Sequence, residues 1–407
     1  MNASESSSVA YQQVSTSPWD LADVFPEKPP DHAYGFMAGK KLIGCSCEEL
    51  IKRCSRDEVP PIHLVWTPDT PRLVPPAEVP FLLEGIKTRA EGRGKRMLIV
   101  GLLNLLLWGG AYWLTSCSAA TLPPSTLRPP SGSSSTDFHR LNVLLLINAF
   151  FLGLLPLKNG IQLYRNSRLL SPQALAKDAR TIRYSVWVST RRKVWTLAIG
   201  GLFAIVGIAQ VKAGLKQSIG AAGLVKDAVR QGEYIRLLTG TMLHGNMFHF
   251  WFNAMALLSL GTLVEALADR TFLMIVYLLS ALAGSIASLL LLPNTTSVGA
   301  SGALMGLIGF LVMLGYRRRA NLPPGFLRSV LTSVFWIALL GAVAFDYIDN
   351  AAHAGGFICG LMMGVVLIGK HSSLPLVPTK TVRIAGVASA LVLIATAGYC
   401  VTKILAK

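Results

Sequence analysis

The chain has 407 residues, of which 52% are hydrophobic and only 14% are charged, and its mean hydropathy is positive. This composition excludes an ordinary soluble domain and predicts a polytopic membrane protein. The net charge of +17 does not predict a nucleic-acid partner. Residues 1–96 hold 13 acids and 12 bases, and the excess of bases beyond them lies mostly in short connections between apolar runs, as in membrane proteins.

Residues 1–96 precede the first apolar run. Residues 1–17 are rich in serine and are predicted to be a disordered tail. Residues 18–96 are interrupted by proline, and their stretch IHLVWTPDTPRLV favours short paired strands, so we interpret them as a small cytosolic region of unknown fold. The late first apolar run and the first base at Lys28 argue against a signal or transit peptide and favour a bacterial plasma membrane.

The six cysteines do not have the spacing of a disulfide framework. Cys45, Cys47, Cys54 and His63 lie near one another in sequence, but they lack the paired CxxC that zinc modules use. We therefore expect ordinary reduced cysteines, with no metal and no cofactor.

Nine apolar runs of membrane-spanning length follow. They lie near residues 97–115, 141–158, 194–211, 247–268, 271–292, 301–316, 328–345, 351–369 and 383–403. The sixth is roughly 24 Å long as a helix, against about 30 Å of hydrocarbon, so it needs water or protein at one end.

The connection 159–193 orients these spans. It holds eight Lys and Arg residues against the single acid Asp178, whereas the connection 116–140 is Ser/Pro-rich and weakly charged. The positive-inside rule then places the N-terminus in the cytosol, and a ninth span leaves the C-terminus outside.

Three spans begin with polar residues, which are costly in a membrane and usually face a bundle interior or a water-filled cavity. The fourth begins with His244, His249 and Asn253, the sixth with Ser301 and the eighth with His353. Even-numbered spans all run from outside to inside, so these side chains are expected at a similar depth. His249 and Asn253 are four residues apart, which places them on one helix face.

Small-residue stripes follow the polar residues of the sixth and eighth spans. The stripes are Gly302 with Gly306 and Gly356 with Gly360 and Gly364. Such stripes let two helices approach closely, and if these two face each other, Ser301 and His353 come within side-chain reach.

Each feature has a structural explanation when taken alone. A GxxxG usually means helix packing, a membrane serine often bonds to its own helix, and a histidine near a span end is often interfacial. Together they supply a nucleophile, a base and two further donors, which are the groups that acyl transfer requires. A transporter with buried histidines and a protein that only binds membrane helices are the alternative functions.

At these residues the sequence resembles the rhomboid intramembrane serine proteases. The similarity covers about residues 190–369. Its three motifs occur in order as His244-Gly-Asn-Met-Phe-His249-Phe-Trp-Phe-Asn253, as Gly299-Ala300-Ser301-Gly302, and as Ala352-His353-Ala354-Gly355-Gly356 followed by Gly360.

The resemblance implies a serine endopeptidase with Ser301 as nucleophile and His353 as its base, without a third carboxylate. It implies that His249, Asn253 and the Ser301 backbone N–H bind the oxyanion, with Gly299 and His244 in supporting positions. The implied substrates are single-span membrane proteins in the lipid bilayer, cut near its outer face.

Two residues depart from the family pattern. Ile235 replaces a tryptophan beside Arg236 in the first outer loop, which concerns the anchoring of that loop. Met305 replaces an aromatic residue that packs on the catalytic imidazole, so we expect altered positioning of the histidine. Asp346, Asp349 and Asn350 are interpreted as surface loop residues rather than as a third catalytic member, because their depth is wrong.

The expected fold is an all-α polytopic membrane protein with a rhomboid-like six-helix core. Two extra spans with their loops occupy residues 97–189, the protease core residues 190–369, and an additional C-terminal span residues 370–407. The expected location is the bacterial plasma (inner) membrane, with a cytosolic N-terminus.

Overall fold

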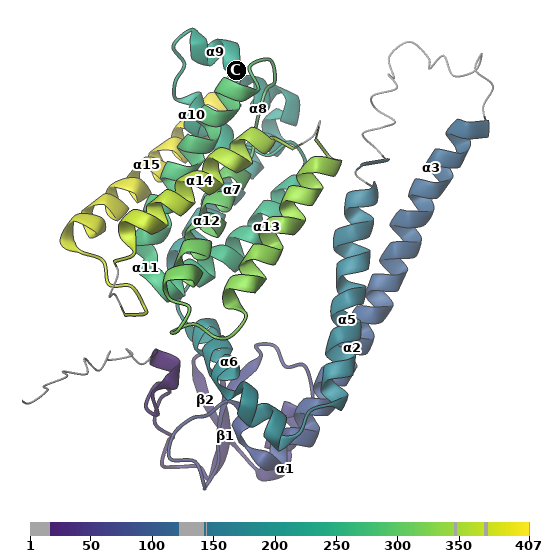
Figure 1. Cartoon of the computed structure of the whole chain (residues 1–407), viewed down its shortest axis with the longest axis vertical. Helices are drawn as coiled ribbons and strands as arrows, with labels where there is room; N and C mark the ends of the chain where they lie inside the picture. The colour runs from purple at the N-terminus through teal and green to yellow at the C-terminus, as the bar shows by residue number, and fades with distance from the viewer. Residues whose placement is uncertain (1–16, 122–141, 144, 346–347, 370–372, 407) are drawn as a thin grey trace, which may run out of the picture.

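The computed structural model describes residues 17–121, 142–143, 145–345, 348–369 and 373–406, and its described part is dominated by helices (Figure 1). Seven of these helices are long and apolar enough to cross a membrane, and a shorter apolar helix, α12 (Ser301–Arg317), accompanies them. One of the seven, α11 (Met247–Leu291), is two helices joined at Asp269, where φ is +71°. These helices correspond to the nine apolar runs, which confirms the polytopic all-α membrane protein.

The N-terminal region folds into a small domain with a three-stranded antiparallel sheet. Its strands are β1 (Tyr34–Ala38), β2 (Lys41–Cys45) and β3 (Ile62–Trp66), in the order β2-β1-β3. Helix α1 (Cys47–Cys54) closes the core, which includes Leu50 and Cys54. β3 and its bridge from Val65 to Val74 lie in the stretch that the sequence predicted to form strands.

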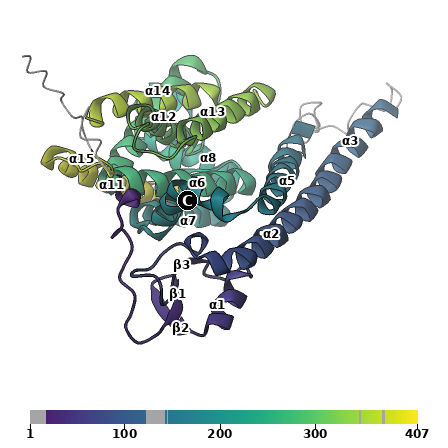
Figure 2. The same ribbon diagram turned by 60° about the horizontal axis from the view of Figure 1, so that its bottom comes forward.

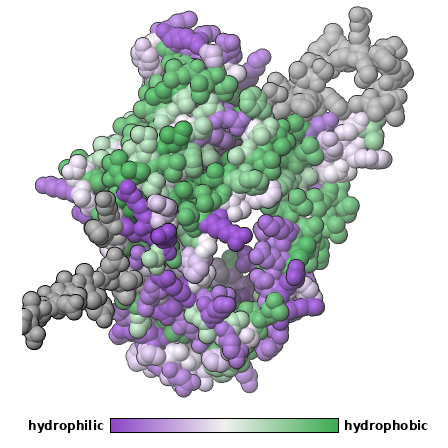
Figure 3. Space-filling model, in the orientation of Figure 1, coloured by the Kyte–Doolittle hydropathy of each residue, from purple (hydrophilic) through white to green (hydrophobic). Residues whose placement is uncertain are grey.

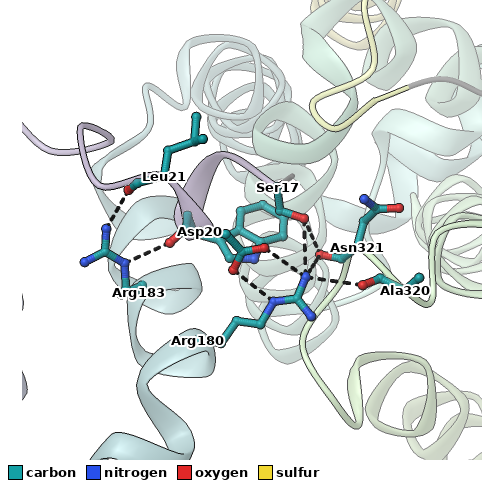
Figure 4. A network of polar contacts seen from close by, with 8 residues as sticks. Ser17, Asp20, Leu21, Arg180, Arg183, Ala320 and Asn321 are labelled. Carbon is teal, nitrogen blue, oxygen red and sulfur yellow. Dashed lines mark hydrogen bonds and ion pairs between the residues drawn. The ribbon is translucent and has the colours of Figure 1, made fainter. Parts of the chain in front are cut away.

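The segment after residue 16 anchors this domain to the membrane part (Figure 4). In the short helix η1 (Pro18–Asp20), the Trp19 ring is fully buried against two aromatic rings of α6 (Pro172–Thr190). Arg180 of α6 forms an ion pair of 3.0 Å with Asp20 and donates to the Asn321 carbonyl at 3.0 Å. The segment therefore joins α6 to the loop after α12, and residues 1–16 of the predicted tail lie outside the described residues.

The two extra N-terminal spans form a helical hairpin that stands beside the core (Figures 1 and 2). Its first arm is α2 (Leu83–Asn104), continued by η4 (Leu105–Gly109) and α3 (Gly110–Thr121), and its second arm is η5 (Ala149–Leu154) with α5 (Leu155–Arg168). Glycines let the arms pack closely, since a Cβ on Gly160 would lie 2.9 Å from the Leu98 nitrogen. Phe151 and Phe150 contact Phe252 of α11 and Trp336 of α13 (Phe326–Val343).

The core is built around α12. This helix packs between α11 and α14 (Asn350–Leu367), and most of its residues are buried. Helix α7 (Val194–Ala213) also packs against α11. The first outer loop contains α8 (Leu215–Ala222), α9 (Lys226–Arg230), α10 (Arg236–Thr239) and η6 (Gly240–Met242).

The additional C-terminal span is α15 (Lys380–Leu405), which packs on α7 and α11. Figure 1 shows that the sheet domain lies at one end of the molecule and that α9 and the C-terminus lie at the opposite end. Between these ends, Figure 3 shows a hydrophobic band over the helices, with hydrophilic surface below and above it. This band is what a helical bundle in a bilayer presents to lipid.

Candidate active site

Ser301 is the first residue of α12, and the preceding loop is held from two sides. Ser297 pairs with Leu224 through two backbone hydrogen bonds of 3.0 and 3.2 Å, and the Gly299 N–H donates to the Gly240 carbonyl at 3.0 Å. Leu224 and Gly240 belong to the first outer loop, at the end of the molecule opposite the sheet domain (Figure 1). The loop therefore sets where α12 begins and where Ser301 lies.

Gly299 has two separate reasons to be glycine. Its φ of +127° lies in the region that residues with a side chain avoid. A Cβ at this position would also lie 2.6 Å from Cε1 and 2.8 Å from Nε2 of His249. The imidazole of His249 is therefore seated against the Gly299 backbone, two residues before Ser301.

His353 lies in the first turn of α14. The Asp349 side chain caps this helix, since one oxygen accepts from the Ala352 N–H at 2.8 Å and the other accepts from the Ser288 hydroxyl. The His353 N–H donates to the Asp349 carbonyl at 3.0 Å. Asp349 is thus half-buried and bonded to α11 and its own helix, whereas Asp346 lies outside the described residues.

The glycine stripes of α12 and α14 face each other, as the sequence predicted. A Cβ on Gly356 would strike the Gly302 carbonyl oxygen, and a Cβ on Gly360 would strike that of Gly306. A Cβ on Gly302 would lie 3.2 Å from the Ala352 carbonyl oxygen, one residue before His353. The first turns of the two helices, which carry Ser301 and His353, are therefore in backbone contact.

Ser301 and His353 are both half-buried residues. Within the described residues no hydrogen bond joins these two side chains. Catalytic hydrogen bonds are often long or misaligned in a free enzyme and tighten when substrate binds.

His249 and Asn253 lie on the first part of α11, across the loop from Ser301. Asn246 caps this helix by accepting from the His249 N–H at 2.8 Å. The buried Asn253 amide donates to the His249 carbonyl at 2.8 Å, which leaves its second N–H for another acceptor. His249 and Asn253 therefore carry donors beside the loop that leads into Ser301.

His244 is buried and supports its neighbour rather than facing the serine. Its ring lies 5.4 Å from the His249 ring, at a steep angle, and it also contacts Phe203 and Phe250. Gln210 of α7 holds the His244 backbone through two hydrogen bonds. The His244 N–H donates to the Gln210 side-chain oxygen at 3.0 Å, and the Gln210 amide donates to the His244 carbonyl at 3.1 Å. Gln210 belongs to none of the sequence motifs, although a glutamine inside an apolar span is a signal of a buried hydrogen bond.

A buried polar network links the outer loop to the helix of His353. Lys226 of α9, only 2% exposed, donates to the Ser297 hydroxyl at 2.7 Å, and this hydroxyl lies 3.0 Å from that of Ser288. Ser288 in turn donates to Asp349. Burial lowers the pKa of the Lys226 ammonium, and the Asp349 carboxylate opposes this shift. None of the sequence motifs includes Lys226, Ser288 or Ser297, and only the tertiary structure brings these residues together.

The outer loop has its own internal anchor. Arg236, 8% exposed, donates from Nη1 to the carbonyls of Gly223 and Gly220 at 2.9 and 3.1 Å, and it pairs with Glu233 at 2.8 Å. Ile235, which replaces the tryptophan of the family pattern, is 39% exposed. Arg236 therefore holds the loop together, whereas the Ile235 side chain is exposed on the loop surface.

This geometry defines a helical membrane protein in which a central helix presents a serine beside a histidine of its neighbour. Residues 231–370 match the family model of the Rhomboid domain. This match confirms the resemblance to the rhomboid family found in the sequence.

Curated relatives align to the same part of the chain. The chain is 37% identical over 142 residues to the Rhomboid protease GluP of Bacillus subtilis (strain 168), covering 34% of this chain and 27% of that protein. It is 35% identical over 148 residues to RHOMBOID-like protein 4 of Arabidopsis thaliana, covering 35% and 36%. It is 31% identical over 139 residues to Rhomboid-like protease 5 of Toxoplasma gondii, covering 34% and 16%. The chain thus spans less than half the length of these relatives.

Proposed function

We propose that this chain is an intramembrane serine endopeptidase that cuts membrane-spanning segments through a Ser301–His353 dyad. The observation that carries the proposal is the packing of α12 on α14 through facing glycines, which puts the first turns that hold Ser301 and His353 in contact. His249, seated against Gly299, and Asn253 lie beside the same loop and supply donors. The relative named as a rhomboid protease supports the same reaction class.

The reaction begins when neutral His353 takes the hydroxyl proton as Ser301 attacks a peptide carbonyl. The tetrahedral oxyanion is stabilised by His249, Asn253 and the Ser301 backbone N–H, each worth on the order of 3 kcal/mol in comparable oxyanion sites. His353 then protonates the leaving amine. In the second half-reaction His353 takes a proton from water as the water attacks the acyl-enzyme, and it returns the proton to Ser301 as the product acid leaves.

The substrates are proposed to be single-span membrane proteins whose helix is locally unwound near the outer face. An intact helix satisfies its own carbonyls, so a cut requires residues that weaken the helix. The loop before Ser301 and the outer loop lie at the end opposite the sheet domain, which sets the depth of the cut (Figure 1). The N-terminus is placed in the cytosol and the C-terminus outside by the positive-inside rule.

Labelling by a fluorophosphonate in detergent tests this proposal. Wild-type protein should be labelled, because the reagent reacts with an activated serine, while Ser301→Ala and His353→Ala should not be. Equal labelling of the Ser301→Ala variant would contradict the assignment of the nucleophile. A wild-type protein that folds but takes no label would favour a helix-binding protein without catalysis.

A further inference from the structure

A cavity of about 700 Å³ opens between α7, the kink of α11 and the start of α15. It lies away from Ser301, because α15 begins at its end nearer the sheet domain, whereas the first outer loop lies at the opposite end of the molecule (Figure 1). Its lining combines three arginines, Arg191, Arg270 and Arg383, with an apolar wall. No residue of the proposed protease site lines it.

The three arginines are free to bind an anion. Among the residues that the structure describes, none of them has a carboxylate within ion-pair distance. The cavity also holds two acids, which are used elsewhere: Glu265 accepts from the backbone of Trp195 and from Thr196, and Asp269 accepts from Thr271. Glu265 caps the start of α7 and Asp269 caps the second half of α11, so both carboxylates are hydrogen-bonded to helix starts rather than to the guanidinium groups.

The walls of the cavity are held in place by direct contacts. Arg191 stacks over the Trp187 ring, with its Cζ 4.3 Å from the ring centroid. The Leu376 N–H donates to the Leu267 carbonyl at 2.9 Å, which fixes the segment before α15 on the kink of α11. Gly386 of α15 packs so closely on Thr271 that a Cβ would lie 2.7 Å from the Thr271 Cβ.

The rest of the lining is apolar and continues onto the lipid-facing helices. Its members include Met274 of α11, Val377 before α15 and Val387 of α15, and Val377 and Val387 are 75% and 52% exposed. A free phosphate gains nothing from contact with an apolar wall, whereas an acyl chain can pack against it. The combination of an arginine rim and an apolar wall at the membrane boundary therefore fits a lipid better than a small ion.

We propose that this cavity binds an anionic glycerophospholipid. The phosphate and headgroup lie on Arg191, Arg270 and Arg383, whose planar guanidinium groups suit phosphate oxygens, and an acyl chain lies along Val377 and Val387. Basic pockets between spans on the cytoplasmic side are suited to anionic headgroups. Since α15 and the segment before it form one wall, the site gives the additional C-terminal span a role outside the protease core.

Native mass spectrometry of the full-length protein tests the site with phosphatidylglycerol, phosphatidylcholine and inorganic phosphate as separate ligands. The variant Arg191→Gln/Arg270→Gln/Arg383→Gln should bind phosphatidylglycerol about a hundredfold more weakly than wild type, at about fivefold per arginine. A matched control, Arg192→Gln/Arg319→Gln/Arg328→Gln, removes the same charge from exposed arginines outside the cavity and should bind as wild type does.

Two further arms separate the lipid from its phosphate alone. Val387→Trp fills the apolar wall and keeps all three arginines, so it should weaken phosphatidylglycerol binding even if the triple arginine variant does not fold. Equal binding by the two triple variants, equal binding of phosphatidylcholine, or an unaffected Val387→Trp variant would each overturn the proposal. Inorganic phosphate that binds as tightly as phosphatidylglycerol would likewise overturn it.

Discussion

At the scale of single residues, the candidate site depends on a few positions where the backbone of one residue lies against the side chain of another. Gly299 is the clearest of them, since its positive φ and the seated His249 ring are both incompatible with a side chain. Met305, which departs from the family pattern, is buried on α12 four residues after Ser301. Its effect on the position of His353 stays a prediction.

Gly299→Ala should reduce fluorophosphonate labelling of Ser301 strongly. The left-handed backbone costs a residue with a Cβ about 1–2 kcal/mol, and the methyl group must also displace the His249 imidazole. Gly220→Ala in the outer loop is the control, because a Cβ there meets no atom within 4 Å. Equal labelling rates for the two variants would show that the His249 contact does not matter for the serine.

Ser288→Ala should destabilise the protein by about 1–2 kcal/mol, because it removes one hydrogen-bond partner from each of the half-buried Asp349 carboxylate and Ser297 hydroxyl. Thermal unfolding in detergent measures the loss. Ser333→Ala removes a hydroxyl that bonds only to its own helix at an exposed position, and it should leave the melting temperature unchanged. Equal melting temperatures of the two variants would show that the network does not stabilise α14.

Cys54 should resist alkylation while its domain is folded. Its side chain is fully buried, and burial raises the pKa of the thiol to about 11 from 9.0. The raised pKa keeps the thiol protonated at pH 8, and it makes the folded domain lose stability as pH rises from about 9 towards 11. Mass spectrometry after maleimide treatment should show Cys54 unmodified in native protein and modified in urea, and native labelling would contradict the buried position.

At the scale of elements, the α12–α14 contact brings together the first turns that carry Ser301 and His353. The helices approach through glycines on both sides, so any added side chain separates them. The hairpin of α2 and α5 uses the same device, with Gly160 against the Leu98 backbone. Close packing through small residues is how helices associate in lipid, where apolar burial gives no drive.

Gly356→Ala should separate α12 from α14 and abolish labelling of Ser301. Its methyl group would collide with the Gly302 carbonyl, and such overpacking costs about 1–3 kcal/mol. Gly398→Ala in α15 is the matched control, because a Cβ there meets nothing within 4 Å. Labelling of Gly356→Ala at the wild-type rate would mean that the dyad does not depend on this packing.

At the scale of the whole molecule, the sheet domain and the C-terminus lie at opposite ends (Figure 1). Trp19, Arg180 and Asn321 connect the domain to the membrane part. The domain therefore belongs to the end of the molecule that we propose to face the cytosol. α15 adds a ninth crossing and, with it, a wall of the proposed lipid site.

Reporter fusions should show this arrangement in a bacterial membrane. Alkaline phosphatase fused after residue 406 should be active, because the ninth span carries it to the outer side, where the enzyme folds. The same reporter fused after residue 369, which omits α15, should be inactive. Activity in the shorter fusion and none in the longer one would reverse the proposed topology.

The sequence by itself determined the spans, the short central helix and the polar residues at the span starts. Bilayer thickness and the cost of a buried polar group act on local stretches of chain, so composition and spacing reveal them. The facing glycine stripes were also predictable, because a four-residue period marks one helix face.

Only the tertiary structure decided which groups meet across these elements. Three such contacts join residues up to 123 positions apart. They are the packing of His249 on Gly299, the hydrogen bonds between Gln210 and His244, and the network from Lys226 to Asp349. The arginine-lined cavity likewise gathers three segments that have no shared motif. Such contacts depend on how the helices pack, and packing is set by the whole set of side chains rather than by any local pattern.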